Sequence, residues 1–154
     1  MSTAQTRAPI RAQIRQIRAE DAEVAARLST ELGYPVDAPA VLERMQQIAG
    51  DRNRAVLVAC LDGEVVGWID LSVEYHLQTE PSVLIGGLVI SESMRGQGIG
   101  LQLSKAAEDW ARSRGVRRMR VRSNAIRERA HAFYLRGGYT RVKTSAVFEK
   151  TLSQ

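Results

Sequence analysis

Three alternating glycines beside an arginine form the part of this sequence best suited to hold an anion. The stretch is Arg95-Gly96-Gln97-Gly98-Ile99-Gly100, and it lies between an apolar, strand-like run and an amphipathic, helix-like run. A helix start offers backbone N–H groups without internal partners and the positive end of the helix dipole. Glycines let a phosphate approach that backbone closely, and the arginine adds a cation. The loop is therefore chemically fit for phosphate.

The spacing of the glycines narrows the kind of phosphate ligand. A nucleotide-hydrolysing P-loop ends in Gly-Lys-Ser/Thr, whereas Gly100 is followed here by Leu101. A dinucleotide site has G-x-G-x-x-G with an acidic residue about twenty positions later, whereas these glycines are evenly spaced and that later region is basic. Both nucleotide sites are disfavoured, and a purely structural turn stays open as an alternative.

A second glycine pair interrupts the apolar run that precedes the loop. Residues 82–90 read SVLIGGLVI, which is typical of a central strand covered on both faces. Glycines inside a strand mark a bulge or a place where another backbone or a ligand comes close. Gly86 and Gly87 therefore predict such a feature, with a packing bulge as the structural alternative.

The elements before this strand follow from periodicity and turn residues. A first strand is expected within 11–18, then a helix within 19–34 that stops at Gly33, and a second helix at about Pro39 to Ala49. Residues 54–76 read as two strands joined by Asp62-Gly63, a strong hairpin signal.

The elements after the loop alternate again between helix and strand. The helix that follows the loop and stops at Gly115 places one set of apolar side chains on one face. A strand is expected within 116–123, a helix within 125–138, and one long strand or a final hairpin within 139–152. The apolar face of the helix after the loop consists of Ile99, Leu103, Ala106, Ala107 and Trp110.

Composition indicates one globular domain. The chain has 154 residues, of which 44% are hydrophobic and 25% charged, and no apolar run approaches the length of a membrane span. We expect a polar, flexible tail at 1–9 and one domain at 10–154. The opening residues lack the apolar core of a secretory signal, so a cytoplasmic location is expected. The single cysteine, Cys60, lies in an apolar run and is interpreted as a buried thiol.

Charge is distributed unevenly along the chain. Residues 1–77 carry 8 Lys and Arg against 11 Asp and Glu, whereas residues 78–154 carry 14 against 6, for a total net charge of +5. If both halves line one cleft, the C-terminal side suits a polyanion and the N-terminal side suits a cation. A solvated surface of mixed charge is the alternative.

From Arg95 to Gly100 the chain resembles the GNAT superfamily of acetyl-CoA-dependent N-acetyltransferases. The pyrophosphate signature of that superfamily, Q/R-x-x-G-x-G/A, is matched in full by these residues. The resemblance extends from about Val83 to Tyr139 and, less closely, from Ile10 to the end. Within the superfamily the chain looks most like the small-amine branch that includes aminoalkylphosphonate and aminoglycoside acetyltransferases. The resemblance implies a single α/β (α+β) domain with a mixed, mostly antiparallel central sheet flanked by helices.

The resemblance also implies a set of site residues. Acetyl-CoA would lie between the fourth and fifth strands, and its acetyl group would pass directly to a primary amine. A backbone N–H near Leu88 or Val89 would hold the developing oxyanion, and the segment to Ile90 would pair with pantetheine. Asn124 would bond the pantetheine arm, with an N-cap as the alternative, and Tyr134 would act as general acid on the coenzyme sulfur, with a core position as the alternative. The pyrophosphate would be held by Arg95, Gly96, Gln97, Gly98, Ile99 and Gly100.

The general base is where this sequence departs from the family. Many members place a glutamate in the fourth strand just before the bulge, where this chain has Gly86 and Gly87. Glu74, Glu31, His76 and an ordered water chain remain as candidates. Glu31 and Tyr34 lie where the family builds the lid over the acceptor, which favours a cationic acceptor: a small metabolite or antibiotic, a protein N-terminus or a lysine side chain.

The residues also bear on other functions and on possible partners. A nucleic-acid module is disfavoured because Arg118, Arg120 and Arg122 alternate with apolar residues, as in a half-buried strand, without interleaved aromatics. The missing glutamate keeps open a coenzyme-binding regulatory domain without catalysis. We expect no metal, no nucleic acid and no membrane partner, and the sequence leaves a homodimer open.

Overall fold

The computed structural model describes residues 10–122 and 128–154. The expected tail at 1–9 and Asn124 lie outside the described residues. The chain forms two compact units, residues 1–121 and residues 122–154, and each is considered by itself.

The N-terminal half of the first unit follows the sequence pattern closely. A strand, two helices and a hairpin are all present where periodicity predicts them. They are β1 (Gln13–Gln16), the short 3₁₀ turn η1 (Ala19–Asp21), α1 (Ala22–Leu32), α2 (Ala38–Ile48), β2 (Arg54–Leu61) and β3 (Glu64–His76).

Turn and cap residues fix the ends of these elements. Gly33 ends α1 with φ +104°, a left-handed conformation that favours glycine. The Asp37 side chain accepts a hydrogen bond from the Ala40 N–H at 2.9 Å and so begins α2. Asp62 and Gly63 both have positive φ, which is the geometry that a two-residue hairpin turn needs. The three boundaries are therefore encoded locally.

The rest of the first unit is a strand, the glycine loop, a helix and a short strand. These are β4 (Thr79–Ile90), the 3₁₀ turn η2 (Glu92–Met94), α3 (Ile99–Ser113) and β5 (Met119–Val121). The expected strand within 116–123 is confirmed but short.

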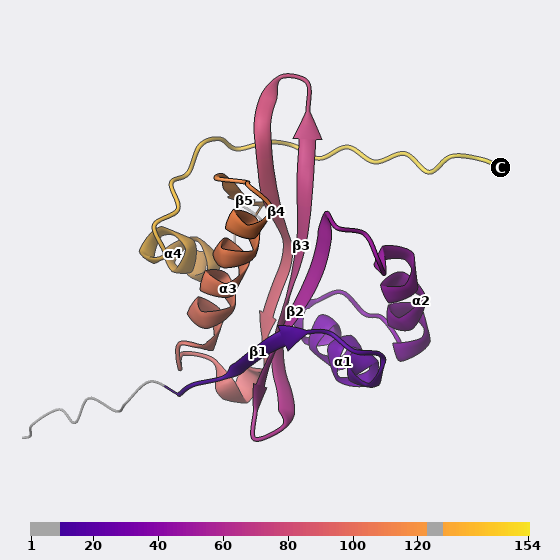
Figure 1. Ribbon diagram of the computed structural model, residues 1–154. Coiled ribbons are helices and arrows are strands. Elements are labelled where there is room, and N and C mark those ends of the chain that lie inside the picture. Colours follow the sequence, from indigo (N-terminus) through magenta and orange to yellow (C-terminus); the bar gives the residue numbers. More distant parts are fainter. Residues whose placement is uncertain (1–9, 123–127) are drawn as a thin grey trace, which may run out of the picture. The chain divides into compact units, whose positions relative to one another are not determined.

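Five strands form one sheet in the order β1-β2-β3-β4-β5. The first four pair antiparallel and β5 pairs parallel to β4, so the sheet is mixed and mostly antiparallel, as expected. Helices α1 and α2 lie on one side of the sheet and α3 lies on the other (Figure 1). The long β3–β4 hairpin runs through the middle of the picture.

Alternation along β3 divides its side chains between the two helical layers. Ile69 and Leu71 are fully buried, whereas Trp68 and Asp70, on the opposite face, are partly exposed. The Trp68 indole donates a hydrogen bond to the backbone oxygen of Ala25 in α1 at 3.2 Å. The α1 side of the sheet is therefore half covered and leaves polar groups accessible.

Helix α3 covers the other face, with one difference from the expected apolar stripe. Ile99, Leu103 and Ala107 are buried as expected. Burial of the Ile99 or Leu103 side chain stabilises the fold by about 1.5 to 3 kcal/mol. Ser104 and Ala111 complete the buried face, whereas Trp110 is half-buried at its margin. The small residues at these positions let the helix lie close to the sheet.

The second unit contains α4 (Glu128–Arg136), which confirms the expected helix. The strand or hairpin expected within 139–152 is wrong, because residues 139–154 have no regular secondary structure. A strand needs a partner for its N–H and C=O groups, and alternating side chains do not supply one. Large apolar side chains of this segment are exposed: Val142, Val147, Phe148 and Leu152.

No helix among the described residues is long and apolar enough to span a membrane.

Candidate functional site

The glycine loop turns the chain from β4 into α3 with a left-handed backbone at two glycines. Gly96 has φ +77° and Gly98 has φ +84°, and Gly98 is the N-cap of α3. An ideal Cβ on either glycine would have no atom within 4 Å, so neighbouring atoms do not require glycine there. The backbone conformation requires it, and the open space above Gly98 is where a ligand could approach.

The start of α3 has no protein cap. Among residues 10–122 and 128–154 no side chain accepts a hydrogen bond from its first turn, and the first bond of the ladder runs from the Gln102 N–H to the Gly98 oxygen at 3.2 Å. Arg95 lies exposed beside it, with its Nε donating to the Ile90 oxygen at 3.3 Å. A cation and a helix N-terminus within one loop are an arrangement that fits an anion.

A β-bulge precedes the loop in β4. Asp70 of β3 pairs with Gly87, and Leu71 pairs with Ile85, so Gly86 is the extra residue. The bulge predicted from the glycine pair is therefore confirmed at Gly86. Gly87 has a packing role, because a Cβ there would lie 2.9 Å from the Trp68 ring.

The bulge leaves an open edge on the C-terminal part of β4. β5 pairs with β4 only at residues 83–85, and within the described residues no strand follows this edge from Gly86 to Ile90. The Ser91 N–H donates to Val66 of β3 at 2.7 Å. Because N–H groups alternate between the two sides of a strand, Val89 faces β3 whereas Leu88 and Ile90 face the open edge. Of the two sequence candidates for an oxyanion donor, the geometry favours Leu88.

An acidic side chain from the neighbouring strand lies over the bulge. Asp70 Cγ and Oδ2 lie 3.8 and 3.9 Å from the point where a Gly86 Cβ would stand. Asp70 Oδ1 accepts a hydrogen bond from Arg54 Nη2 at 2.7 Å, and Arg54 Nε donates to the Leu71 oxygen. A partly exposed ion pair thus faces the bulge glycine of β4.

A cavity of about 320 Å³ lies between the helices α1 and α2 and the strands β2 and β3. Trp68 and Asp70 belong to its sheet side, together with Arg54. Arg44 and Gln47 of α2 and Ser29 of α1 are polar members of its helical side. The apolar side chains that line it are Ile17, Val36, Val41, Met45, Ile48 and Val56.

A buried ion pair attaches α1 to the sheet. Arg15 of β1 donates two hydrogen bonds to the Asp21 carboxylate, at 2.7 and 3.0 Å, and the Arg18 N–H donates a third at 2.7 Å. The Arg15 hydrogen bond is the main cause that holds the pKa of Asp21 below its usual range, against the effect of burial. This pair fixes the wall of the cavity that α1 forms.

The acidic and aromatic residues expected to meet the acceptor do not line this cavity. Glu31 is exposed near the end of α1, and Tyr34 is 64% exposed in the turn that follows. Glu74 lies farther along β3 and contacts His76 Nε2 at 3.1 Å. The structure therefore does not bring these candidates together, and Asp70 is the acidic group at the bulge.

Tyr134 lies in α4, within the second unit. Its ring packs edge-on against Phe133 at 5.3 Å and against Tyr139 at 5.6 Å between centroids. The Tyr139 N–H donates to the Tyr134 oxygen at 3.0 Å in the turn after the helix. Tyr134 is thus held in an aromatic cluster of its own unit.

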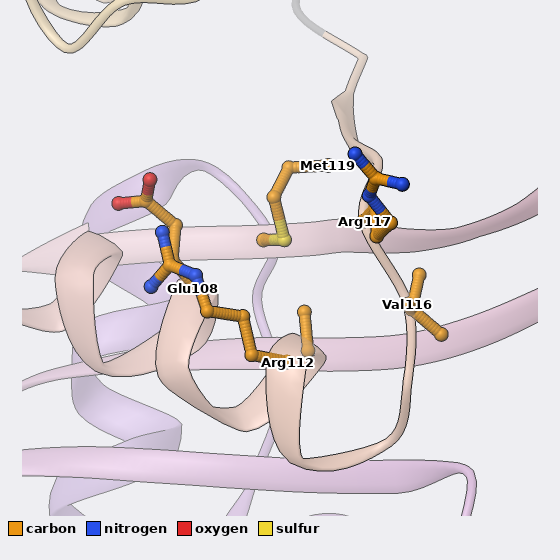
Figure 2. Close-up of a pocket in the computed structure, with 6 residues that line it drawn as sticks. Glu108, Arg112, Val116, Arg117 and Met119 are labelled. Atoms are coloured by element: carbon orange, nitrogen blue, oxygen red, sulfur yellow. The ribbon is translucent and has the colours of Figure 1, made fainter.

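A smaller hollow of about 210 Å³ lies near the C-terminal end of α3, where Glu108 and Arg112 approach Val116, Arg117 and Met119 (Figure 2). Figure 2 shows Glu108 and Arg112 on the α3 side of this hollow, and Val116, Arg117 and Met119 on the segment that leads into β5. The hollow is remote in sequence from the glycine loop, which is at the opposite end of α3, and we assign it no part in the site.

Sequence reasoning missed Asp70, Arg54 and the cavity that they line. Asp70 alternates with apolar residues in a strand, which is the ordinary pattern of a half-exposed face. Its place beside Gly86 depends on the β3–β4 register, and a one-residue shift would move it to the other face. A signal was nevertheless present, because Asp70 is the sole acidic residue in the middle of an otherwise uncharged run from 65 to 73.

The described residues contain no group of three His, Cys, Asp or Glu side chains that could hold a metal ion.

One family model matches most of the chain. The acetyltransferase (GNAT) family model covers residues 13–139. This range includes the bulge, the open strand edge and the glycine loop.

Curated relatives carry the names of small-molecule acetyltransferases. An aminoalkylphosphonate N-acetyltransferase of Salmonella typhimurium is 42% identical over 90 residues, which are 58% of this chain and 58% of the relative. An aminoglycoside N(6')-acetyltransferase type 1 of Stenotrophomonas maltophilia is 29% identical over 88% of this chain and 92% of the relative.

Solved structures share the fold. A transcriptional regulator from Bacillus halodurans has a TM-score of 0.82 at 23% identity, over 91% of this chain and all of the other. AAC(6')-Iy in complex with a bisubstrate analogue of CoA and acetylneamine has a TM-score of 0.81 at 22% identity, over 93% of this chain and all of the other.

Proposed function

The chain belongs to the acetyltransferase (GNAT) family and is an N-acetyltransferase for a small-molecule amine, and on that premise we propose how its own residues perform the reaction. The observation that carries the proposal is the open edge of β4, which begins at a glycine bulge and runs directly into the uncapped start of α3. The two features together fit one extended ligand that has an amide-containing arm and a pyrophosphate. Acetyl-CoA is such a ligand and supplies the acetyl group as a thioester.

The loop would hold the pyrophosphate. The N–H groups of the first turn of α3 donate to phosphate oxygens, and Arg95 adds charge beside them. Gly96, Gln97, Gly98, Ile99 and Gly100 form the cradle, and the left-handed backbone at Gly98 keeps its ligand side free of a side chain.

The edge of β4 would hold the arm and the reacting carbonyl. Leu88 and Ile90 present their N–H groups to the open edge, so an amide chain can pair with β4 as an added strand. Val89 contributes the intervening backbone and anchors the strand with its buried side chain. The Leu88 N–H would donate to the carbonyl oxygen as negative charge develops on it. Asn124, outside the described residues, would bond the same arm.

Tyr134 would supply the proton for the departing thiolate. A tyrosine hydroxyl carries a proton that it can donate to a leaving group. The aromatic cluster with Phe133 and Tyr139 fixes the ring direction. The attacking amine must be neutral, and no described histidine lines the cavity, so its proton would leave through water.

A thiol-release screen with acetyl-CoA tests the reaction. Polyamines, aminoglycosides, aminophosphonates, amino acids and peptides are offered as acceptors, and free coenzyme thiol is measured. We expect turnover with a small amine. Turnover with peptides alone would mean a protein acetyltransferase. Coenzyme binding without thiol release from any acceptor would mean a regulatory domain.

Tyr134→Phe tests the general acid. We expect turnover to fall by about 100-fold or more, because the thiolate loses its proton donor, whereas acetyl-CoA affinity stays within about twofold. Tyr75→Phe is the matched control, since Tyr75 is an exposed tyrosine of β3 outside the site. Steady-state rates and calorimetric titration measure the two quantities. An unchanged rate in Tyr134→Phe removes this residue from the mechanism.

The remaining parts of the proposal concern the extent of the domain, its location in the cell and its partners. We propose that residues 10–154 act as one domain, that the enzyme works in the cytoplasm, and that the reaction needs no metal. Its partner is a small molecule rather than nucleic acid or a membrane. Light scattering of the purified chain distinguishes a monomer from a homodimer.

A further inference from the structure

The cavity between the two N-terminal helices and the sheet meets the glycine bulge of β4 at one acidic side chain. Asp70 is the sole acidic residue among the described residues that line this cavity. Its carboxylate lies over Gly86, because Cγ and Oδ2 are 3.8 and 3.9 Å from the position of a Gly86 Cβ. A molecule in the cavity can therefore contact Asp70 and the bulge at the same time.

The strand geometry brings this carboxylate close to the edge where, on the proposed function, the thioester carbonyl is held. Asp70 and Gly87 are directly opposite each other in the β3–β4 ladder, and paired strands lie about 4.8 Å apart. The next residue of β4 is Leu88, whose N–H faces the open edge. Gly86 and Gly87 carry no side chains, so the surface of β4 between Asp70 and this N–H is bare backbone.

Arg54 fixes one oxygen of the Asp70 carboxylate and leaves the other available. Oδ1 accepts a hydrogen bond from Arg54 Nη2 at 2.7 Å, and Arg54 Nε donates to the Leu71 oxygen at 3.1 Å. Among residues 10–122 and 128–154, no group donates a hydrogen bond to Oδ2. The Asp70 side chain is 37% exposed, so water reaches it. Oδ2 is therefore an oriented acceptor that can take a proton and return it to solvent.

The acidic and histidine candidates from the sequence lie elsewhere. Glu74 is four residues farther along β3 than Asp70, which is about 13 Å in an extended strand, and it contacts His76. His76 is six residues from Asp70, which is about 20 Å. Glu31 is exposed near the end of α1 and does not line the cavity. Asp70 thus occupies a position beside the bulge that none of the three reaches.

We propose that Asp70 is the general base of the reaction and accepts, through Oδ2, the proton that the acceptor nitrogen loses as it bonds to the acetyl carbon. This inference rests on the proposed function and adds a catalytic residue to it. Arg54 is a positioning residue, because it holds the carboxylate by Oδ1 and so directs Oδ2.

The protons balance over the whole step. The bound ammonium loses its first proton to water and attacks as a neutral amine. As the C–N bond forms, the nitrogen gains positive charge and becomes a much stronger acid, so a carboxylate can take its second proton. The C–S bond then breaks, and Tyr134 protonates the sulfur. Asp70 releases its proton to solvent, and Tyr134 regains one from solvent.

Asp70→Asn tests the base, because it keeps the size of the side chain and removes the proton acceptor. Thiol release is measured with the amine that reacts fastest in the screen. We expect kcat to fall about 100-fold or more, whereas acetyl-CoA affinity in calorimetric titration stays within about twofold. Asp109→Asn is the matched control, because Asp109 is also paired with an arginine, at 3.0 Å, but is exposed on α3 and does not line the cavity.

Arg54→Gln separates the loss of the base from the loss of the ion pair. It breaks the same pair with Asp70 but leaves the carboxylate in place. We expect its kcat to exceed that of Asp70→Asn by about tenfold or more, because the proton acceptor remains. Equal losses in the two variants would mean that the ion pair matters and the carboxylate does not, which overturns the inference.

A carboxylate supplied from β4 gives a test by rescue. Gly86 does not have a positive φ, and the nearest atom to its ideal Cβ is 3.8 Å away, so a side chain fits there. Gly87 offers no such place, because its Cβ would lie 2.9 Å from the Trp68 ring. Combined with Asp70→Asn, Gly86→Glu should raise kcat about tenfold or more over Asp70→Asn alone, whereas Gly86→Gln should not. Recovery with neither, at intact acetyl-CoA affinity, or equal recovery with both overturns the inference.

The base and the proposed function fail in different ways. If the wild type releases thiol and Asp70→Asn releases it equally fast, the base fails and the acetyltransferase stands. If the wild type releases no thiol with any amine of the screen, the proposed function fails and the base fails with it.

Discussion

At the scale of single residues, burial and charge decide what the site can do. The Arg15–Asp21 pair is the buried ion pair that joins β1 to the start of α1, with the Asp21 side chain 6% exposed. The pKa of Asp21 lies below its usual range because the folded state favours the charged form. Such a group contributes stability above its unfolded pKa of about 3.9 and loses it as pH falls toward the folded value.

Asp21→Asn should therefore destabilise the protein by about 3 kcal/mol at neutral pH, because it leaves Arg15, whose side chain is only 17% exposed, without its charged partner. The difference from the wild type should shrink as the pH falls below the unfolded-state pKa of about 3.9 and Asp21 in the wild type becomes protonated. Urea unfolding at several pH values measures both effects. Asp109→Asn, in an exposed pair with Arg112, serves as the control and should change stability little. A difference that stays constant with pH would mean that charge is not the cause.

The role of a residue in the site could be predicted where a sequence motif specifies it. It could not be predicted where the role depends on the register between strands. The glycine loop and a bulge within the Gly86-Gly87 pair were expected from the sequence, whereas the close approach of Gly87 to Trp68 was not. Asp70 became part of the site through its pairing with Gly87, which local patterns do not determine. Glu31 and Tyr34 were expected from the family's acceptor lid and the acidic N-terminal half, and neither ground places a side chain in the cavity.

At the scale of elements, the turn from β4 to α3 is the part that the ligand would contact most. Gly98 has φ +84° and an empty ligand side, so a side chain there is strained and also intrudes on the helix start. Strain alone costs about 1 to 3 kcal/mol in stability. The further effect, loss of the anion cradle, is specific to this position.

Gly98→Val should weaken acetyl-CoA binding by about 100-fold or more, because it blocks the N–H groups of the first turn. Gly50→Val is a matched control, since Gly50 has φ +80° and also has no atom within 4 Å of an ideal Cβ. Both variants should lose similar stability, whereas only Gly98→Val should lose coenzyme affinity in calorimetric titration. Equal affinity in the two variants would mean that the loop binds something else.

Element boundaries were predicted well where a cap or a turn is local. Gly33, Asp37 and the Asp62-Gly63 turn mark their ends by backbone preference alone. The segment at 139–152 has the alternation of a strand but lacks the partner that a strand needs. Alternating apolar residues indicate which face of a strand would be buried. They do not indicate which neighbouring strand would accept and donate its backbone hydrogen bonds.

At the scale of the whole molecule, the net charge of +5 arises from the C-terminal half. The bound coenzyme is a polyanion on the proposed function, and its approach is favoured by the summed positive field. Composition predicts this behaviour without any structure, because long-range potential depends on total charge more than on the fold.

Raising the salt concentration from about 0.05 M to about 0.5 M should slow acetyl-CoA association about threefold or more, because the Debye length becomes shorter than the distances over which steering acts. Stopped-flow binding measures the rate constant, and uncharged sucrose at matched viscosity is the control. A rate that is independent of salt would mean that the charge asymmetry has no part in capture.

The burial of Cys60 is useful for assays that detect free coenzyme thiol. Cys60 is the chain's single cysteine, and it is buried with 5% of its surface exposed. Dyes that react with free sulfhydryl groups should therefore record product in real time with little background from the folded enzyme. An added surface cysteine would accept a fluorophore selectively, so the native thiol need not be replaced before labelling. A burst of dye reaction on heating would in turn report unfolding of the sheet around Cys60.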